Sequence, residues 1–298
     1  MIGNMTPNLE HLLASRDRVG ESPLWSVEEQ TLYWVDILGC RFHRYHQPSG
    51  TWDTYTVDAS VGALALRASG GLVLATGKGF ALYDVSTKTI SWLAQPELDP
   101  ARMRFNDGKV DCRGRFWAGT MSLMAADWNL MQGSLYRLDS DSTVHRMDTA
   151  YALINGIGWS PDDTRMYVVD SVQRAIYLYD FDADTGAIAY RRTFLDTSHE
   201  MGVPDGLTVD SEGAIWVAYW DGWKIVRYDS EGKRLSQVDL PVQCPTSCAF
   251  GGRDLDECYI ASAWEELNEE QKASQPLAGD LFKIRPGVKG IPSPLFRG

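Results

Sequence analysis

The chain has 298 residues, and its 28 basic and 40 acidic side chains give a net charge of −12 at neutral pH. Nucleic acids and anionic membranes bind basic surfaces, so this charge argues against both as partners. The chain has no apolar run long enough to cross a bilayer and no signal-like start, which predicts a cytoplasmic protein. Its 11 Trp, 13 Tyr and 27 Gly favour many short strands joined by tight turns.

A hairpin pattern recurs along the chain: a strand, a polar turn, and a second strand that contains an apolar or aromatic pair. The clearest copies begin at Val110 and Val209, and another copy begins midway between them at Trp159. The equivalent second-strand positions are, in chain order, Tyr33, Val73, Trp117, Tyr167, Trp216 and Tyr259. Their spacing of 40 to 50 residues predicts six repeated units.

Each hairpin is followed by segments that favour a third and a fourth strand. Third strands are expected at 41–45, 80–83, 134–138, 175–179, 224–228 and 280–284. More polar fourth strands are expected at 51–57, 89–94, 143–147, 191–195 and 234–240. A single four-stranded sheet cannot bury both of its faces, but six sheets packed around an axis can. The sequence therefore predicts an all-β fold, a six-bladed β-propeller of antiparallel sheets, as one domain spanning residues 1–298.

The sixth repeat lacks a fourth strand, because no strand pattern follows residue 284. Residues 9–14 could supply that strand and close the ring, although the same residues could form one helical turn. Irregular stretches are expected at 99–104, 121–132 and 265–278. The last of these is rich in Glu and Gln and predicts a short surface helix.

The first strand of each propeller blade lines the central channel, and the starts of these strands cluster at one end of the axis. Four of the six repeats place a carboxylate or amide there, at Glu21, Asp107, Asn155 and Asp205. Such oxygen ligands suit a hard divalent cation. An isolated Asn-Gly or Asp-Gly is more often a turn. Recurrence at one blade position favours a metal site of Glu21, Asn155 and Asp205, and leaves a turn or outward role open for Asp107.

These segments also carry a family resemblance. The motifs are Gly20-Glu-Ser-Pro-Leu-Trp25, Arg104-Phe-Asn-Asp-Gly-Lys-Val-Asp111, Asn155-Gly-Ile-Gly-Trp-Ser160 and Pro204-Asp-Gly206. Together they resemble the senescence marker protein/gluconolactonase/luciferin-regenerating family. The resemblance extends over about residues 21–284, and several motifs in the same order make it specific for the family but not for one substrate.

The resemblance implies hydrolysis of sugar lactones at one divalent metal, with Ca²⁺, Zn²⁺, Mn²⁺, Mg²⁺ and Fe(II) as candidates. It implies Glu21, Asn155 and Asp205 as the metal ligands and Arg104 as the substrate-binding cation. Asn106 is expected either to complete the metal shell or to contact the substrate. The expected partner is a small sugar lactone, such as gluconolactone or xylonolactone, and the expected state is a monomer.

Opening a cyclic ester requires a nucleophilic water and a group that stabilises the developing oxyanion. Asp205 is the candidate general base because a carboxylate beside a metal can accept a proton from water, and Glu21 is the alternative. Arg104 could form forked hydrogen bonds to sugar hydroxyls or to the product carboxylate. No Gly-x-Ser-x-Gly motif is present, and no histidine lies at a strand start, with His199 the nearest to a site residue.

Two alternatives to a sugar lactonase stay open at this point. The first is a calcium-binding or regulatory propeller without catalytic activity. The second is a propeller hydrolase for lipophilic lactones or organophosphates, which predicts an apolar mouth to the channel.

Overall fold

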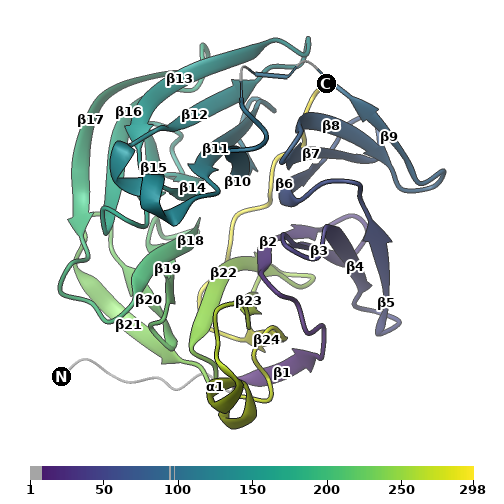
Figure 1. The fold of residues 1–298 in the computed structure, drawn as a ribbon, viewed down its shortest axis with the longest axis vertical. Helices are drawn as coiled ribbons and strands as arrows, with labels where there is room; N and C mark the ends of the chain where they lie inside the picture. Colours follow the sequence, from purple (N-terminus) through teal and green to yellow (C-terminus); the bar gives the residue numbers. More distant parts are fainter. Residues whose placement is uncertain (1–8, 94, 97) are drawn as a thin grey trace.

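The computed structural model describes residues 9–298 except 94 and 97. Its strands form six four-stranded antiparallel sheets arranged as blades around a central axis (Figure 1). The predicted six-bladed β-propeller is therefore confirmed. No helix among the described residues is long and apolar enough to cross a membrane.

The strands run outward from the axis in chain order within five of the six blades. Blade 1 contains β2 (Gly20–Ser26), β3 (Thr31–Asp36), β4 (Arg41–His46) and β5 (Thr51–Thr56). Blade 2 contains β6 (Val61–Leu66), β7 (Leu72–Thr76), β8 (Gly79–Asp84) and β9 (Thr89–Trp92). Blade 3 contains β10 (Met103–Val110), β11 (Phe116–Ser122), β12 (Gly133–Leu138) and β13 (Val144–Tyr151). Blade 4 contains β14 (Ile154–Trp159), β15 (Arg165–Asp170), β16 (Ala175–Asp182) and β17 (Ala187–Asp196). Blade 5 contains β18 (Val203–Val209), β19 (Ile215–Trp220), β20 (Lys224–Tyr228) and β21 (Arg234–Asp239). Blade 6 contains β22 (Cys244–Gly251), β23 (Glu257–Ala263), β24 (Leu281–Ile284) and β1 (Glu10–Leu13).

The N-terminal strand closes the ring. Strand β1 pairs antiparallel with β24 as the outer strand of blade 6, with Glu10 opposite Lys283. The His11 ring adds a contact of 2.8 Å between its Nε2 and Asp280 Oδ2. The segment is therefore a strand, as expected for ring closure, and the alternative of a helical turn is wrong.

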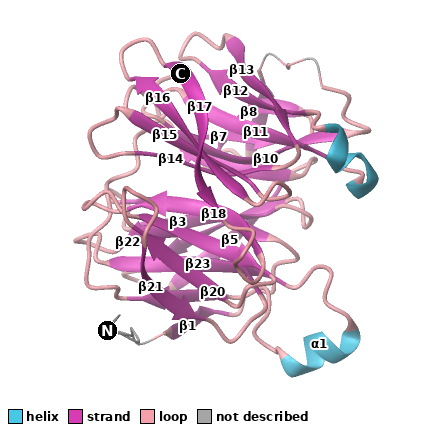
Figure 2. Ribbon diagram, turned by 90° about the vertical axis from the view of Figure 1, so that its left-hand side faces the viewer, coloured by secondary structure: helices cyan, strands magenta, loops and turns pink. Residues whose placement is uncertain are grey.

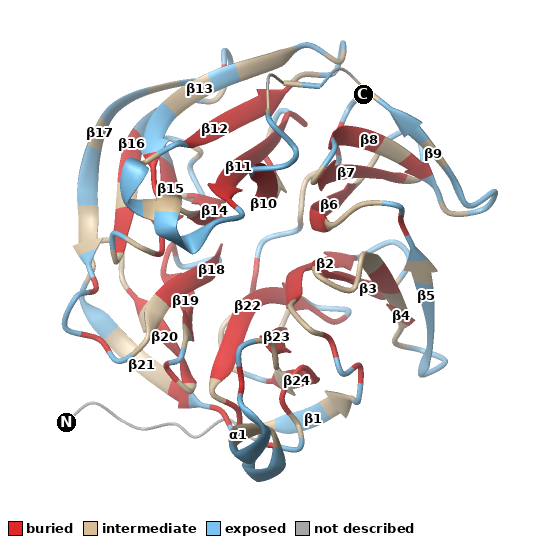
Figure 3. Cartoon of the chain, in the orientation of Figure 1, coloured by how far each residue is buried: buried red, intermediate tan, exposed pale blue. Residues whose placement is uncertain are grey.

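Burial decreases from the axis to the rim of each blade (Figure 3). Strand β2 is buried along its whole length, whereas β5 is almost entirely exposed. Large rings fill the space between neighbouring blades, as where Trp25 stacks on Tyr259 with ring centroids 5.3 Å apart. This packing accounts for much of the aromatic surplus in the composition.

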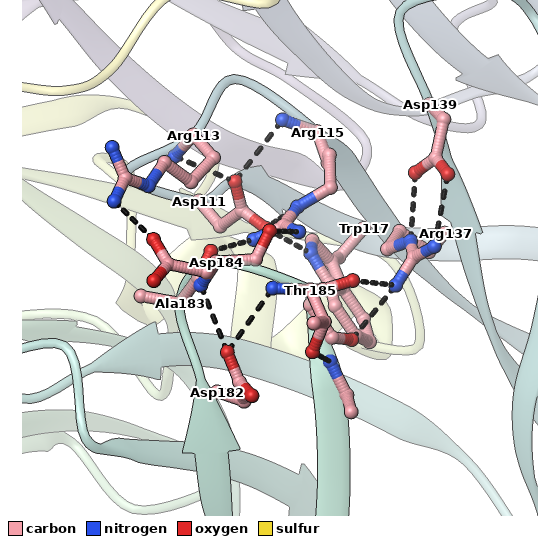
Figure 4. A network of polar contacts seen from close by, with 12 residues as sticks. Asp111, Arg113, Arg115, Trp117, Arg137, Asp139, Asp182, Ala183, Asp184 and Thr185 are labelled. Atoms are coloured by element: carbon pink, nitrogen blue, oxygen red, sulfur yellow. Dashed lines mark hydrogen bonds and ion pairs between the residues drawn. The ribbon is translucent and has the colours of Figure 1, made fainter.

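The polar turn of the repeated hairpin also has a structural role, seen in blade 3 (Figure 4). The Asp111 carboxylate accepts hydrogen bonds from Trp117 Nε1 at 2.9 Å and from Arg115 Nε at 2.6 Å. Arg115 also donates through Nη2 to the backbone carbonyl of Ala183 in blade 4, at 2.6 Å. The equivalent pair in blade 5 is Asp210 and Trp216, with a bond of 2.9 Å. Some of the many acidic residues therefore connect strands and blades.

Several elements differ from the sequence expectation. The outer strand β13 continues past the expected 143–147 to Tyr151, and β17 begins before the expected 191–195 at Ala187, because pairing with β12 and β16 includes these residues. The loop after β11 contains a short 3-10 helix, η1 (Ala125–Leu130), which the sequence did not indicate. The expected surface helix is present as α1 (Glu269–Ser274) and begins with a capping box. Both helical segments lie on the same face of the propeller (Figure 2). The expected strand 89–94 ends at Trp92, and residue 94 lies outside the described residues.

The C-terminal tail is the largest feature without a counterpart in the repeat. After β24 it crosses the centre of the ring, drawn in yellow in Figure 1, and forms isolated bridges at Asp210–Gly290 and Arg67–Phe296. The side chain of Phe296 is only 1% exposed and joins the core between blades 2 and 3. Residues 291–294 line a cavity of about 190 Å³ at the far end of the channel from the site described below.

Candidate active site

Each inner strand contains a β-bulge close to its start. The register shifts fall between Glu21 and Leu24, Val61 and Ala63, Phe105 and Gly108, Ile154 and Ile157, Pro204 and Leu207, and Pro245 and Ser247. A bulge interrupts the alternation of a strand and redirects its side chains. Glu21, Asn106, Asn155 and Asp205 all lie in or at these bulges, so the same irregularity points four side chains from four blades toward the channel.

Glycines beside these residues let the inner strands approach closely. A Cβ added at Gly62 would lie 2.3 Å from the backbone oxygen of Asn106, and one added at Gly206 would lie 2.4 Å from Ser247 Cβ. Real side chains do not tolerate such distances, so both positions require glycine unless a strand moves. The glycines of the Asn155-Gly156 and Asp205-Gly206 pairs therefore allow neighbouring blades to pack closely.

The structure brings five predicted site residues to one cavity of about 640 Å³ at one end of the channel. These residues are Glu21, Arg104, Asn106, Asn155 and Asp205. All five are buried, with exposed fractions between 3% for Glu21 and 9% for Arg104. Residues that are far apart in the sequence therefore form one enclosed polar group.

Hydrogen bonds fix the amides of this group. Asn106 Nδ2 donates to Asn155 Oδ1 and to the carbonyl of Ile154, both at 2.9 Å. Asn155 Nδ2 donates to Ser171 Oγ at 2.9 Å, and Arg104 Nη1 donates to Asn106 Oδ1 at 2.7 Å. Asn106 therefore has its oxygen engaged by Arg104 and orients Asn155. Asn155 Oδ1 keeps a second lone pair that a cation could use.

The two carboxylates are poorly satisfied by the protein. Glu21 Oε2 accepts a hydrogen bond of 2.5 Å from the Ser22 amide, but Glu21 Oε1 is buried without a partner among the described residues. Among the described residues, no group donates a hydrogen bond to the Asp205 carboxylate. Buried charges require a compensating partner. Two such carboxylates beside a fixed amide oxygen fit a divalent cation.

The described residues contain no group of three or more His, Cys, Asp or Glu side chains arranged to hold a metal. The set here is different, because its third oxygen comes from the amide of Asn155.

The pKa shifts of the site residues also indicate that the site has too little positive charge for its two carboxylates. Burial raises the pKa of Glu21 well above its usual range, and the Asp205 and Asp107 carboxylates raise it further. Burial likewise raises the pKa of Asp205, with Asp107 adding to the effect and Arg104 opposing it. Burial lowers the pKa of Arg104 to about 10, so the guanidinium stays charged at neutral pH. A bound divalent cation would favour the ionised form of both carboxylates.

Asp107 faces a different cavity from the other site residues. It lines the far cavity beside Lys109 and accepts hydrogen bonds from Ser22 Oγ at 2.9 Å and from the Gly108 amide at 2.6 Å. Asp107 lies within β10, where the bulge falls between Phe105 and Gly108, and not in a turn between strands. The His199 side chain is 69% exposed and does not line the cavity of about 640 Å³ that holds the site.

The sequence analysis did not identify several further residues that line this cavity. They include Trp128, Ser171, Arg174, Trp220 and Glu266. All five belong to the connections between the second and third strands of their blades or to the adjoining strand end. In an up-and-down blade, these connections lie at the same end as the start of the first strand. Repeat equivalence could have indicated the position of these loops, but not which of their side chains turn inward.

Comparison with known proteins agrees with this architecture. The sequence profile of the SMP-30/Gluconolactonase/LRE-like region matches residues 19–264. Regucalcin from Gallus gallus is 41% identical over 294 residues, which cover 97% of this chain and 98% of that protein.

Two solved structures are also similar over almost the whole chain. A luciferin-regenerating enzyme has a TM-score of 0.91 at 31% identity, covering 98% of this chain and 100% of that one. A calcium-binding protein, regucalcin, from Agrobacterium tumefaciens has a TM-score of 0.93 at 29% identity, covering 98% of each chain. Since the profile matches most of the chain and the relatives align along nearly all of it, the chain belongs to the SMP-30/gluconolactonase/LRE-like family.

Proposed function

We propose that the protein is a metal-dependent lactonase that opens an aldono-1,4- or 1,5-lactone to the aldonic acid. The observation that carries the proposal is the pair of buried, poorly satisfied carboxylates of Glu21 and Asp205. They share one cavity with an oriented amide oxygen and a guanidinium. A sugar lactone is small and polar, which suits this buried end of the cavity. Membership of a family whose description includes gluconolactonase supports the same reaction type.

In this proposal Glu21, Asn155 and Asp205 would hold the cation. A divalent cation supplies Lewis-acid chemistry when bound, polarising an ester carbonyl and making water more acidic. Oxygen ligands alone do not select among Ca²⁺, Zn²⁺, Mn²⁺, Mg²⁺ and Fe(II). Asn106 holds the Asn155 amide in the orientation that presents its oxygen to the cavity.

Asp205 is the proposed general base. Among the described residues its carboxylate accepts no hydrogen bond, so its lone pairs are free to take the proton from an attacking water. Burial raises the pKa of this carboxyl in the metal-free chain, whereas a bound cation would favour the ionised form, which is the form that accepts a proton. Arg104 uses Nη1 to hold the Phe105 carbonyl and Asn106 Oδ1. Its other N–H groups are left to donate to the developing oxyanion or to the carboxylate of the product.

The test is a proton-release assay with D-glucono-1,5-lactone and D-xylono-1,4-lactone as substrates. Protein stripped with a chelator is supplied with each of the five candidate ions in turn. We expect turnover above spontaneous opening with at least one ion and loss of turnover in chelator. Rates equal to spontaneous opening with every ion would contradict the proposal.

A second candidate is a calcium-binding propeller without catalytic activity. It is favoured by the printed description of the Agrobacterium tumefaciens structure as a calcium-binding protein, regucalcin. The same oxygen ligands would hold the ion in both cases, so calorimetry with Ca²⁺ is run beside the assay. Binding without turnover on any lactone would favour this candidate.

A further inference from the structure

The outer part of the site cavity has an apolar wall. It is lined by Leu123 and Trp128 in the loop between β11 and β12, by Leu38 and Val172 in other loops, and by Met121 and Trp220 near the ends of β11 and β19. Leu123 is 46% exposed although it is a large apolar side chain. The Trp128 ring is held in place because its Nε1 donates to the carbonyl of Ser122 at 3.0 Å. The wall therefore includes one fixed indole and a leucine that nothing covers among the described residues.

The polar groups in this outer part are mostly engaged elsewhere. Arg174 Nη2 donates to the backbone carbonyls of Glu200 and Gly202, both at 2.6 Å, while its Nε is buried without a partner among the described residues. Glu265 is paired with Arg18 at 2.8 Å. Asp221 Oδ1 likewise accepts a hydrogen bond of 2.8 Å from Gln243 Nε2.

Glu266 is the one outer acid for which the described residues show neither a hydrogen bond nor an ion pair. Among the described residues, sugar hydroxyls would find Glu266 and Arg174 Nε unengaged here, and apolar atoms would find the apolar wall.

The size of the cavity also favours a substrate larger than a monosaccharide lactone. Its volume of about 640 Å³ falls within the range of about 300–1,000 Å³ typical of pockets for drug-sized ligands. A monosaccharide lactone is much smaller than such ligands. A lactone ring at Asp205 and Arg104 would leave the apolar part of the cavity open beyond it.

We propose that this outer part is an apolar subsite for an alkyl or aryl substituent carried by the lactone ring. The inference rests on the proposed lactonase function of the polar end and specifies its substrate class: lactones with a neutral, apolar substituent are favoured over bare rings. The apolar wall favours a neutral substituent, and Glu265, Glu266 and Asp221, which border the same cavity, would repel an anionic one.

The first test is a chain-length series on the metal-loaded protein. The substrates are γ-valerolactone, γ-hexalactone and γ-nonalactone, whose substituents lengthen from methyl to pentyl, with D-glucono-1,5-lactone assayed in parallel. Burial of a methylene predicts that kcat/KM rises by about twofold to fourfold for each one added. A value that stays constant or falls along the series would overturn the inference.

The second test compares two leucines of the same loop. Leu123→Ser removes an apolar side chain from the wall, and Leu130→Ser is the matched control because Leu130 is 57% exposed and does not line the cavity. We expect Leu123→Ser to lower kcat/KM for γ-nonalactone by about fivefold, and to lower it for γ-valerolactone by much less. Leu130→Ser should match the wild type on both of these lactones, and equal behaviour of the two variants would overturn the inference.

A binding experiment separates this inference from the lactonase proposal. The lactam 5-pentyl-2-pyrrolidinone resists hydrolysis, and calorimetry should show that it binds at least tenfold more tightly than 2-pyrrolidinone. Leu123→Ser should lose most of that difference. If gluconolactone is hydrolysed but the pentyl group adds no affinity, the subsite is wrong and the lactonase proposal stands. If no lactone is hydrolysed, the lactonase proposal fails and the lactam pair alone decides the subsite.

Discussion

Burial of the Asp205 and Glu21 carboxyl groups lowers the stability of the metal-free folded chain. Their side chains are 5% and 3% exposed, and burial raises the pKa of each carboxyl well above its usual range. Arg104 is the cation that offsets part of this cost. Such an arrangement is typical of sites where function is favoured over stability.

Asp205→Asn is therefore expected to separate stability from activity. Without metal, the variant should be more stable by about 1–3 kcal/mol near neutral pH, because the wild-type carboxyl must either be buried as a charge or take up a proton on folding, whereas an amide of the same shape is neutral. Lactonase turnover should be lost, because an amide cannot accept the proton from water. Urea denaturation in chelator and the proton-release assay measure the two effects.

Asp58→Asn is the control for removing one negative charge, since the Asp58 side chain is fully exposed and only pairs with Lys78. It should change stability by about 0–1 kcal/mol and leave turnover intact. Normal turnover in Asp205→Asn would remove Asp205 from the mechanism.

The raised pKa values also predict how stability depends on pH without metal. Glu21 and Asp205 have ordinary pKa values of 4.5 and 3.8, and both values are higher in the folded chain. Above about pH 4.5 the unfolded chain has lost these protons while the folded chain keeps them. Stability should then fall as pH rises toward neutral, by up to about 1.4 kcal/mol per pH unit for each group.

The measurement is the free energy of unfolding in chelator between pH 5 and 7, for the wild type and for Asp205→Asn. Asp205→Asn should show a shallower decline, because one of the two raised groups is gone. Saturating metal should also reduce the decline, since it binds the ionised form. Parallel curves for the wild type and the variant would contradict this explanation.

At the scale of elements, the β-bulges of the inner strands direct side chains from different repeats into one site. Ser22 has a φ of 46°, which is unusual for a residue other than glycine, and its hydroxyl bonds to both Gly62 O and Asp107 Oδ1. These contacts connect three inner strands, β2, β6 and β10. The position of Glu21 therefore depends on packing between blades as well as on its own strand.

Gly62→Ala is expected to disturb this packing. The added Cβ would lie 2.3 Å from Asn106 O and 2.6 Å from Phe105 O, both backbone atoms of β10. Stability should fall by about 1–3 kcal/mol, and metal affinity and turnover should fall with it as Asn106 moves. Thermal unfolding and calorimetry with the metal measure these changes.

Gly70→Ala provides the comparison. A Cβ there would meet nothing within 4 Å, but its φ of +91° strains an alanine. It should lose stability and retain turnover and metal affinity. Full metal affinity in Gly62→Ala would show that the site does not depend on this contact.

At the scale of the whole molecule, the two ends of the chain complete what the repeats leave open. Strand β1 supplies the outer strand of blade 6, and the C-terminal tail joins blades across the far end of the channel. The backbone of Phe296 exchanges hydrogen bonds of 2.8 Å with Leu66 and Ala68 of blade 2. The tail therefore acts as a tie between parts of the ring that are distant in sequence.

Phe296→Ala should lower the free energy of unfolding by about 3–5 kcal/mol, because it removes a ring that is 1% exposed from the core. Leu295→Ala is the neighbouring control, since Leu295 is 41% exposed, and it should cost about 0.5 kcal/mol or less. Urea denaturation of both variants measures the difference. Similar losses would show that the tail is not part of the core.

Much of the fold could be predicted because the pattern of the hairpin is local. The third strand 224–228 was expected at its observed bounds, and ring closure by residues 9–14 was anticipated from the missing strand of blade 6. The extension of β17 to ten residues was not predicted, because an outer strand is polar and its length depends on the turn that precedes it. A monomeric state, a single domain and a cytoplasmic location stay predictions.

The sequence by itself determined the number of blades and indicated Glu21, Asn155 and Asp205, because both follow from equivalent positions in a repeat. The roles of Arg104 and Asn106 were indicated by the family resemblance. Only the tertiary structure decided that Asp107 faces the far cavity, that Leu123 and Trp128 form an apolar wall, and that the tail crosses the ring. The reason is physical. Strand periodicity is set by neighbours along the chain, whereas the direction of a bulged side chain or a loop is set by the blades that pack against it.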